Sequence, residues 1–223
     1  MANSKETKIE PSRLIRYFSG LFIMTAGIAI SVKSNLGVSP VSSIPYTMTR
    51  CWGIEMGKAT ILFHCVLVFL QILILRKNFK LKSLLQIPIG VVFGYFTSFC
   101  NYLMTFVPSP ENFVVRICMV LISIVLVAIG IFFYLPANII PLAGEGVMQA
   151  VSDVTKIAFP KVKIAFDITM VVISLVTCLI VIHSIGSVGL GTIMAAVLVG
   201  VVLGQIMRLW SLYKIRHCEN NQI

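Results

Sequence analysis

Six long apolar runs, separated by short polar stretches, dominate the pattern of the chain. At a rise of about 1.5 Å per residue, each run covers about 25–35 Å, enough to cross a hydrocarbon core of about 30 Å. The pattern therefore predicts an all-α membrane protein with six transmembrane helices. The predicted spans are Leu14–Val32, Ala59–Leu75, Ser83–Phe106, Phe113–Leu135, Ile164–Ile182 and Gly186–Met207.

The composition supports this fold class and excludes others. Of the 223 residues, 58% are apolar and 12% are charged, whereas an ordinary soluble domain has about 25% charged residues. A soluble domain of this size could not cover its surface with so few polar groups. The composition excludes a cytosolic enzyme, a disordered chain and a secreted disulfide scaffold, and it makes the lipid bilayer the expected partner.

The net charge of +10 is explained by basic residues that flank the predicted spans. It does not require a nucleic-acid partner. Basic residues gather on the cytoplasmic side of membrane helices, and here fourteen flank one side and four the other. Both termini are therefore predicted to be cytoplasmic. The larger group is Lys5, Lys8, Arg13, Arg16, Arg76, Lys77, Lys80, Lys82, Lys156, Lys161, Lys163, Arg208, Lys214 and Arg216, and the smaller group is Lys33, Arg50, Lys58 and Arg116.

Three motifs recur in the same order in the second half of the chain, two at an offset of 103 residues and one at 110. They are GIAISVKSN (Gly27–Asn35) with GIFFYLPAN (Gly130–Asn138), GKATILFH (Gly57–His64) with PKVKIAFD (Pro160–Asp167), and GVVFG (Gly90–Gly94) with GVVLG (Gly200–Gly204). Each half then holds three spans, an odd number, so the second half enters the membrane from the opposite face. We expect a cytoplasmic tail at 1–12, one repeat at 13–107, an inverted repeat at 113–210 and a cytoplasmic tail at 211–223.

Between its first two spans, each half carries a segment that is too polar to cross the bilayer comfortably. Segments 34–57 and 138–160 open with Asn, Gly and Pro and then have the pattern of a short amphipathic helix, which in the second segment is expected to follow Gly144–Gly146. We interpret both as re-entrant or half-helix elements, because irregular backbone at depth is tolerated only inside protein or beside a watery cavity. The alternatives are two surface helices, or two further spans, which would make the halves parallel.

Several stretches resemble a known family. They are LGVSP (Leu36–Pro40), LLQIPIGVVFGYF (Leu84–Phe96), PLAGEGVM (Pro141–Met148), KVKIAFD (Lys161–Asp167) and VGLGTIMAAVLVG (Val188–Gly200). From about Arg13 to Arg208 the chain resembles the YczE/YyaS-like family of bacterial integral membrane proteins, whose biochemical function is unknown. The resemblance implies a polytopic protein of the bacterial cytoplasmic (inner) membrane, and it supplies no substrate.

Acidic residues beside the spans are the first candidates for chemistry. A charge at the centre of a membrane helix costs about 2.5–3.5 kcal/mol on insertion scales and so indicates a polar cavity. Glu145, between two glycines, is the strongest candidate for binding a solute or a proton, and its alternative role is to complement a helix N-terminus. Asp167, in the fifth span, is the second candidate, and its alternative role is a local ion pair with Lys163 one turn earlier.

Four further residues extend the candidate site through the repeat. His64 is the equivalent of the fifth-span acid, and it either shares a proton path with it or forms a hydrogen bond inside the bundle. Asn35 and Asn138 open the two broken segments, where they either cap backbone groups or coordinate a substrate. Asp153, the equivalent of Arg50, either faces water or pairs with Arg50 near the repeat axis.

Glycines predict how the spans pack. G-x-x-x-G occurs at Gly90–Gly94 and at Gly200–Gly204, and small residues let helices approach closely in lipid. We therefore expect spans three and six to cross as a central pair at the repeat interface. A homodimer seam is the alternative.

The most economical function is a small secondary transporter of a small polar solute, with proton coupling as an option. The alternatives are a non-transporting membrane accessory or scaffold protein and a membrane subunit of a larger transport complex. No nucleotide-binding, nucleophile-elbow or zinc-protease motif occurs in the sequence, so we expect no enzyme activity, cofactor or metal.

Overall fold

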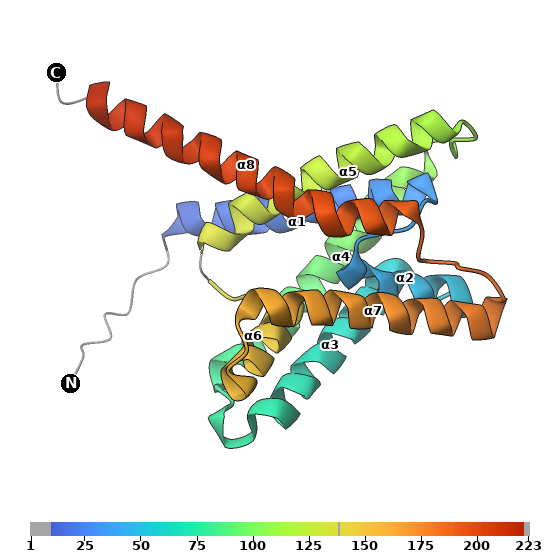
Figure 1. Ribbon diagram of the computed structural model, residues 1–223, viewed down its shortest axis with the longest axis horizontal. Coiled ribbons are helices and arrows are strands. Elements are labelled where there is room, and N and C mark those ends of the chain that lie inside the picture. Colours follow the sequence, from blue (N-terminus) through green and yellow to red (C-terminus); the bar gives the residue numbers. More distant parts are fainter. Residues whose placement is uncertain (1–9, 138, 221–223) are drawn as a thin grey trace.

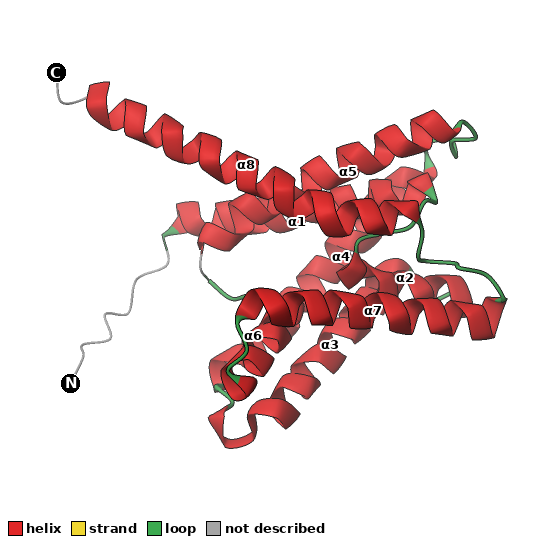
Figure 2. Ribbon diagram, viewed as in Figure 1, coloured by secondary structure: helices red, strands yellow, loops and turns green. Residues whose placement is uncertain are grey.

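The computed structural model describes residues 10–137 and 139–220, with side chains for 10–137 and 139–212. Within these ranges every regular element is a helix (Figure 2). The α-helices are α1 (Pro11–Ser34), α2 (Pro40–Trp52), α3 (Met56–Leu75), α4 (Gln86–Thr105), α5 (Phe113–Tyr134), α6 (Ala143–Thr155), α7 (Phe159–Ile182) and α8 (Leu190–Asn220). Short 3₁₀ turns at Arg76–Asn78 and Leu81–Leu85 join α3 to α4, and another at Leu135–Ala137 follows α5.

The six predicted spans are confirmed: α1, α3, α4, α5, α7 and α8 are long and apolar enough to cross a membrane. The sixth begins at Leu190 rather than at the predicted Gly186. Gly186 has a φ of +52° and lies in a turn before the helix. At its other end α8 continues to Asn220, into the segment expected to be the C-terminal tail.

The centre of the fold is an antiparallel crossing of α1 and α5 (Figure 1). A Cβ atom on Gly20 would lie 2.7 Å from the carbonyl oxygen of Gly130, and one on Gly27 would lie 2.9 Å from that of Ser123. The two backbones therefore touch at two points along the crossing. In lipid, where apolar burial gives little net gain, such close backbone packing is a main source of helix association.

Two arginines tie the ends of this crossing together. Arg13 Nη2 donates to the carbonyl oxygen of Ala137 at 2.8 Å, and Arg116 Nε donates to that of Ser34 at 2.7 Å. The last carbonyl groups of a helix lack donors within the helix and carry the negative end of its dipole. Each arginine satisfies the end of the opposite helix.

Several features of the helices recur at the offset of the sequence motifs. α2 begins at Pro40 and α6 at Ala143, 103 residues later, and both helices have 13 residues. The contacts between helices recur in the same way: α1 packs on α4 as α5 packs on α8, and α2 packs on α7 as α6 packs on α3. The two arginine contacts obey the same offset, since 103 residues separate both the donors and the acceptors.

One helix pair departs from this equivalence. α4 packs closely along α3, and both glycines of the Gly90–Gly94 motif press against that helix. α8 instead diverges from α7 (Figure 1), and no atom of the described residues lies within 4 Å of the Cβ position at Gly200 or Gly204. The prediction that spans three and six form the central pair is wrong, because in the described part of the chain the glycines that meet across the centre belong to α1 and α5.

The two short helices lie among the spanning helices. α2 contacts α3, α7 and α8, while α6 contacts α3, α4 and α7, and about half the residues of each are buried. Gly144 and Gly146 lie in the first turns of α6 rather than before it. The helix needs a glycine there, because a Cβ on Gly146 would lie 2.6 Å from Oε1 of Gln71.

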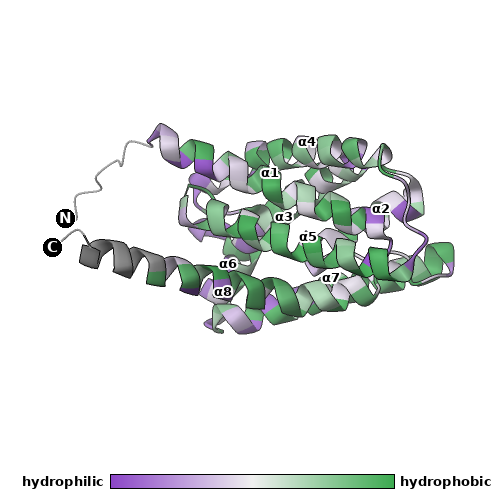
Figure 3. Ribbon diagram, turned by 90° about the horizontal axis from the view of Figure 1, so that it is seen from above, coloured by the Kyte–Doolittle hydropathy of each residue, from purple (hydrophilic) through white to green (hydrophobic). Residues whose placement is uncertain are grey.

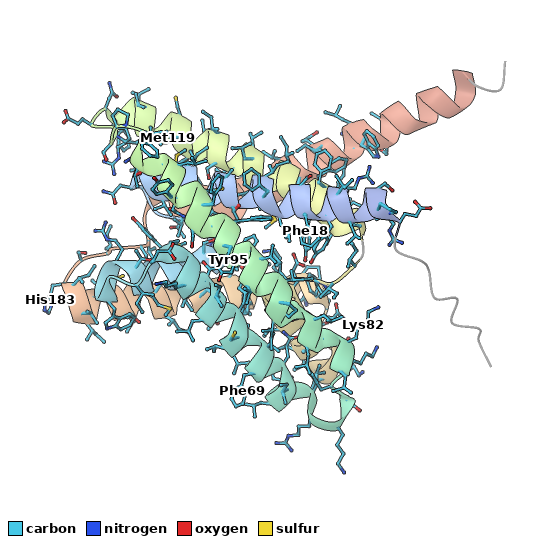
Figure 4. All side chains as sticks on the ribbon, turned by 180° about the vertical axis from the view of Figure 1, so that it is seen from behind. Phe18, Phe69, Lys82, Tyr95, Met119 and His183 are labelled. Carbon is cyan, nitrogen blue, oxygen red and sulfur yellow. The ribbon has the colours of Figure 1, made fainter. Side chains whose placement is uncertain are left out.

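Most of the outer surface is apolar. Hydrophobic positions line much of α5, α7 and α8 (Figure 3), and Phe69 on α3 and Tyr95 on α4 point outward with 59% and 67% of their surface exposed (Figure 4). A soluble monomer rarely exposes so continuous an apolar surface. The chain is a multi-pass membrane protein.

We predict that Gly130→Ala destabilises the protein although alanine is the better helix former. Its Cβ would overlap Met24 Cγ and would lie 2.7 Å from the carbonyl oxygen of Gly20, and overpacking of this kind costs about 1–3 kcal/mol, or about 5 °C in Tm. Thermal unfolding in detergent measures the effect. Gly200→Ala, at an open position, is the matched control, and equal Tm values for the two variants would contradict the proposed crossing.

Candidate functional site

Glu145 occupies the first turn of α6, where it meets the end of α5. The hydroxyl of Tyr134 donates to Glu145 Oε2, and it accepts a hydrogen bond from the backbone N–H of Leu142 at 2.6 Å. Tyr17 of α1 packs its ring 5.3 Å from that of Tyr134 and donates to the carbonyl oxygen of Ile140 at 2.8 Å. Two tyrosines from the central crossing thus fix both the carboxylate and the chain that leads into α6.

The environment of Glu145 is less polar than water but not closed. Its side chain is half-buried, and burial raises the pKa of this carboxyl, while the Tyr134 hydroxyl, the Leu142 N–H and the charge of Lys163 act in the opposite direction. A carboxyl balanced in this way can exchange a proton or neutralise a cation as its surroundings change.

Lys163 and Asp167 place a second acid and a cation beside this site. Lys163 Nζ lies 2.7 Å from Asp167 Oδ2, one turn apart on α7. The local ion pair considered as the alternative for Asp167 therefore forms. The other carboxylate oxygen of Asp167, Oδ1, is buried and has no hydrogen-bond partner in the described part of the chain. We call Tyr17, Tyr134, Glu145, Lys163 and Asp167 the α6 cluster.

Two buried glutamines anchor α6 from the other side. Gln71 Nε2 donates to Gln86 Oε1 at 2.8 Å and to the carbonyl oxygen of Ala143 at 3.2 Å. Ala143 begins α6, so the amide of Gln71 sets the depth at which the helix starts. Buried polar side chains of this kind hold helices together in lipid, where an unpaired amide is costly.

The remaining predicted residues lie apart from the α6 cluster. His64 is buried on α3, stacks on Phe93 with ring centroids 5.5 Å apart, and has no hydrogen-bond partner at Nδ1. At this atom, the hydrogen bond inside the bundle that was one alternative for His64 does not form among the described residues. Asp153 is exposed and accepts from Gln149 at 2.8 Å.

Of the two predicted asparagines, the structure describes only Asn35. Asn35 ends α1 in the left-handed conformation, with a φ of +53°, at the far end of that helix from the cluster. Its side-chain oxygen accepts from Arg50 Nη1 at 3.3 Å and caps no backbone group. The pairing of Arg50 with Asp153 does not occur. Asn138 lies outside the described residues, and within those residues no three His, Cys, Asp or Glu side chains gather closely enough to hold a metal ion.

A second polar seam joins α2 to α7. Ser174 of α7 donates to Ser43 of α2 at 2.8 Å, and the hydroxyls of Thr47 of α2 and Ser187, in the turn between α7 and α8, lie 2.5 Å apart. The repeat equivalent of this seam is the contact of α6 with α3, where Gln71 lies. Both broken segments are therefore held by side-chain hydrogen bonds to a span of the other half.

Sequence reasoning missed the tyrosines and the glutamines. Gln71 and Gln86 could have been found, because each is a polar residue at the edge of a long apolar run and such residues usually face the protein interior. Tyr17 and Tyr134 gave no such signal. Aromatic residues near span ends are common interfacial anchors, and only the antiparallel crossing brings these two together beside α6.

Comparison with known proteins places the chain among proteins of unassigned activity. Residues 11–208 match the family described as a family of unknown function, DUF6198. Over 188 residues the chain is 24% identical to the uncharacterized membrane protein YczE of Bacillus subtilis (strain 168), covering 84% of this chain and 81% of the relative. It is 23% identical over 195 residues to the uncharacterized protein YyaS of the same strain, covering 86% and 90%. No solved structure matches.

We predict a pH-dependent effect of Glu145→Gln on stability. Because burial raises the pKa of Glu145 above its ordinary 4.5, the folded state binds this proton more tightly than the unfolded state does. Its contribution therefore favours folding at low pH and is lost as pH rises from the unfolded-state pKa through the folded-state pKa. Glutamine does not titrate. The Tm of the variant minus the Tm of the wild type should therefore increase as pH rises from about 4 to about 8.

The matched control is Asp153→Asn, which removes an exposed carboxylate from the same helix. It measures the general effect on Tm of losing a carboxylate from α6. A Glu145→Gln difference that stays constant across the pH series would contradict the prediction.

Proposed function

We propose that this chain, which belongs to the family of unknown function DUF6198, is a small secondary transporter of a small polar solute. It lies in the bacterial cytoplasmic membrane with both termini in the cytoplasm, as its basic flanks predict. Its two halves are inverted repeats that exchange conformations to open the site to either face.

The observation that carries the proposal is the difference between two equivalent helix pairs. In the first half α3 and α4 are closed: a Cβ on Gly57 would overlap Ser98 Oγ, and one on Gly94 would overlap Ile61 Cγ1. In the second half the corresponding pair, α7 and α8, is open at Gly200 and Gly204. If the two halves are repeats, this difference represents a closed and an open form of one unit.

Alternating access needs these two forms. If the halves are equivalent, the structure with α7 and α8 closed and α3 and α4 open has nearly the same internal contacts as the present one. The α3–α4 pair closes at its Gly57 end, and the α7–α8 pair would close at its Pro160 end. Under the predicted topology these two ends lie on opposite faces of the membrane. The present structure is then closed outside and open towards the cytoplasm.

The α6 cluster is the proposed solute and proton site. The cluster can form ion pairs and hydrogen bonds with a small polar molecule that carries charge of either sign. It offers two acids, a single lysine and two phenol groups. The exchangeable proton is assigned to Glu145. Asp167 supplies a second carboxylate, whose buried Oδ1 has no hydrogen-bond partner among the described residues. Protonation of Glu145 would weaken its attraction to Lys163 and so couple proton and solute binding.

The open face of α8 also supports a second candidate, a membrane subunit or scaffold that binds a partner protein. On that alternative Gly200 and Gly204 receive a helix of another chain, since G-x-x-x-G faces serve such contacts. The two functions differ in one respect: a scaffold has no need to close α8 on α7.

We predict that cysteines introduced at Ala158 and Arg208 form a disulfide in membranes, although α7 and α8 diverge in the present structure. These positions correspond by the repeat offsets to Glu55 and Ser98, whose side chains meet at 2.9 Å. The pair Glu55→Cys, Ser98→Cys is the matched control for the closed unit. Both pairs are placed in a chain whose native cysteines, at 51, 65, 100, 118, 178 and 218, are replaced, and oxidation is followed by electrophoresis.

A transporter should form both disulfides, and a solute that prefers one state should change the ratio of their rates. That response identifies the solute class in a metabolite screen and should be lost in Glu145→Gln. If the 55–98 pair oxidises fully while the 158–208 pair never does, α8 does not close and the scaffold function is favoured.

A further inference from the structure

A pocket of about 310 Å³ lies at the opposite end of the central crossing from the α6 cluster. It opens between the end of α1, the end of α2 and the loop before α5. The polar residues that line it are Lys33, Asn35, Tyr46, Arg50, Ser109 and Arg116.

The pocket is strongly cationic. Lys33, Arg50 and Arg116 come from three different elements and converge on one cavity. Among the described residues the only salt bridge joins Lys163 to Asp167, so none of these three cations is paired with an acid. No acidic side chain from the described part of the chain lines the cavity. Three unpaired cations around one open pocket repel one another, and an anion relieves that repulsion.

Two of the three cations are held in place around Asn35. Arg116 donates to the carbonyl oxygens of Ser34 at 2.7 Å and of Asn35 at 2.5 Å, and Arg50 Nη1 donates to Asn35 Oδ1 at 3.3 Å. Each guanidinium has five N–H donors, so each keeps donors free after these contacts. Arginines fixed in this way lose little freedom when they bind an anion, and they suit the several oxygens of a phosphate group.

The distribution of charge along the sequence strengthens the case. The side of the membrane predicted to be external keeps only four basic residues, Lys33, Arg50, Lys58 and Arg116. Three of those four line the same pocket. Depletion of positive charge from this side is the general rule for membrane proteins, so the retained cluster requires a local reason.

We infer that this pocket binds a phosphate group, presented either by a soluble phosphate or phosphate ester or by the headgroup of an anionic lipid. Lys33, Arg50 and Arg116 neutralise its charge, and Tyr46 and Ser109 add hydroxyl donors to the wall. The inference stands independently of the proposed transport function, since it concerns a different site on the opposite face.

The test uses the purified full chain and two probes. Inorganic phosphate is titrated at constant ionic strength against chloride, with Tm in neutral detergent as the readout. Phosphatidylglycerol is titrated separately, with phosphatidylcholine as the comparison lipid, and bound lipids are counted by native mass spectrometry. Lys33→Gln and Arg50→Gln are the test variants. Lys58→Gln, which removes a cation of the same predicted side outside the pocket, is the matched control, and Arg116 is left intact because it caps α1.

Each test variant should weaken binding of the effective probe about tenfold or more, as expected for loss of a charge-assisted contact, while Lys58→Gln binds as the wild type does. Binding of inorganic phosphate assigns the site to a soluble anion, and binding of phosphatidylglycerol alone assigns it to a headgroup. The Tm of each variant without probe verifies folding. The inference is overturned if the wild type binds neither probe, or if Lys33→Gln and Arg50→Gln both fold and bind as tightly as Lys58→Gln.

Discussion

The antiparallel crossing of α1 and α5 is the contact on which the rest of the structure depends. Gly20, Gly27 and Gly130 bring the two backbones together, and Arg13 and Arg116 satisfy the helix ends at either side. In a bilayer the hydrophobic effect does not press helices together, so small residues and hydrogen bonds must do so. Every other spanning helix is placed by its contact with this pair or with a short helix that begins beside it.

The second constraint is that backbone polar groups in lipid must be satisfied within the protein. The chain breaks its helices between the first two spans of each half, and each break is surrounded by hydrogen-bonding side chains. Around α6 these are Tyr134, Gln71 and Gln86. The same groups that make the break tolerable also create a polar site beside Glu145. The side chains that satisfy the interrupted backbone therefore also form the candidate site.

The six spans could be predicted from the sequence, because span length is set by the thickness of the bilayer. The offset of 103 residues also separates the first residues of α2 and α6, and it could have linked Arg13 to Arg116. Packing was harder to predict. Gly200–Gly204 has the same motif as Gly90–Gly94 but meets no neighbour in the described part of the chain, because the motif permits close approach without specifying a partner. For the site, Glu145, Lys163 and Asp167 were expected, whereas the tyrosines that hold Glu145 are brought there only by the crossing.

The central claim is that the two halves enter the membrane from opposite faces, and sidedness tests it most directly. The two single variants are Ser12→Cys, in the first turn of α1, and Ser109→Cys, in the loop before α5, each in a chain without its native cysteines. Both positions are exposed. A membrane-impermeant thiol reagent should label the Ser109→Cys variant in intact cells, and it should label the Ser12→Cys variant only after permeabilisation. Labelling of both variants from the same face would contradict the inverted arrangement.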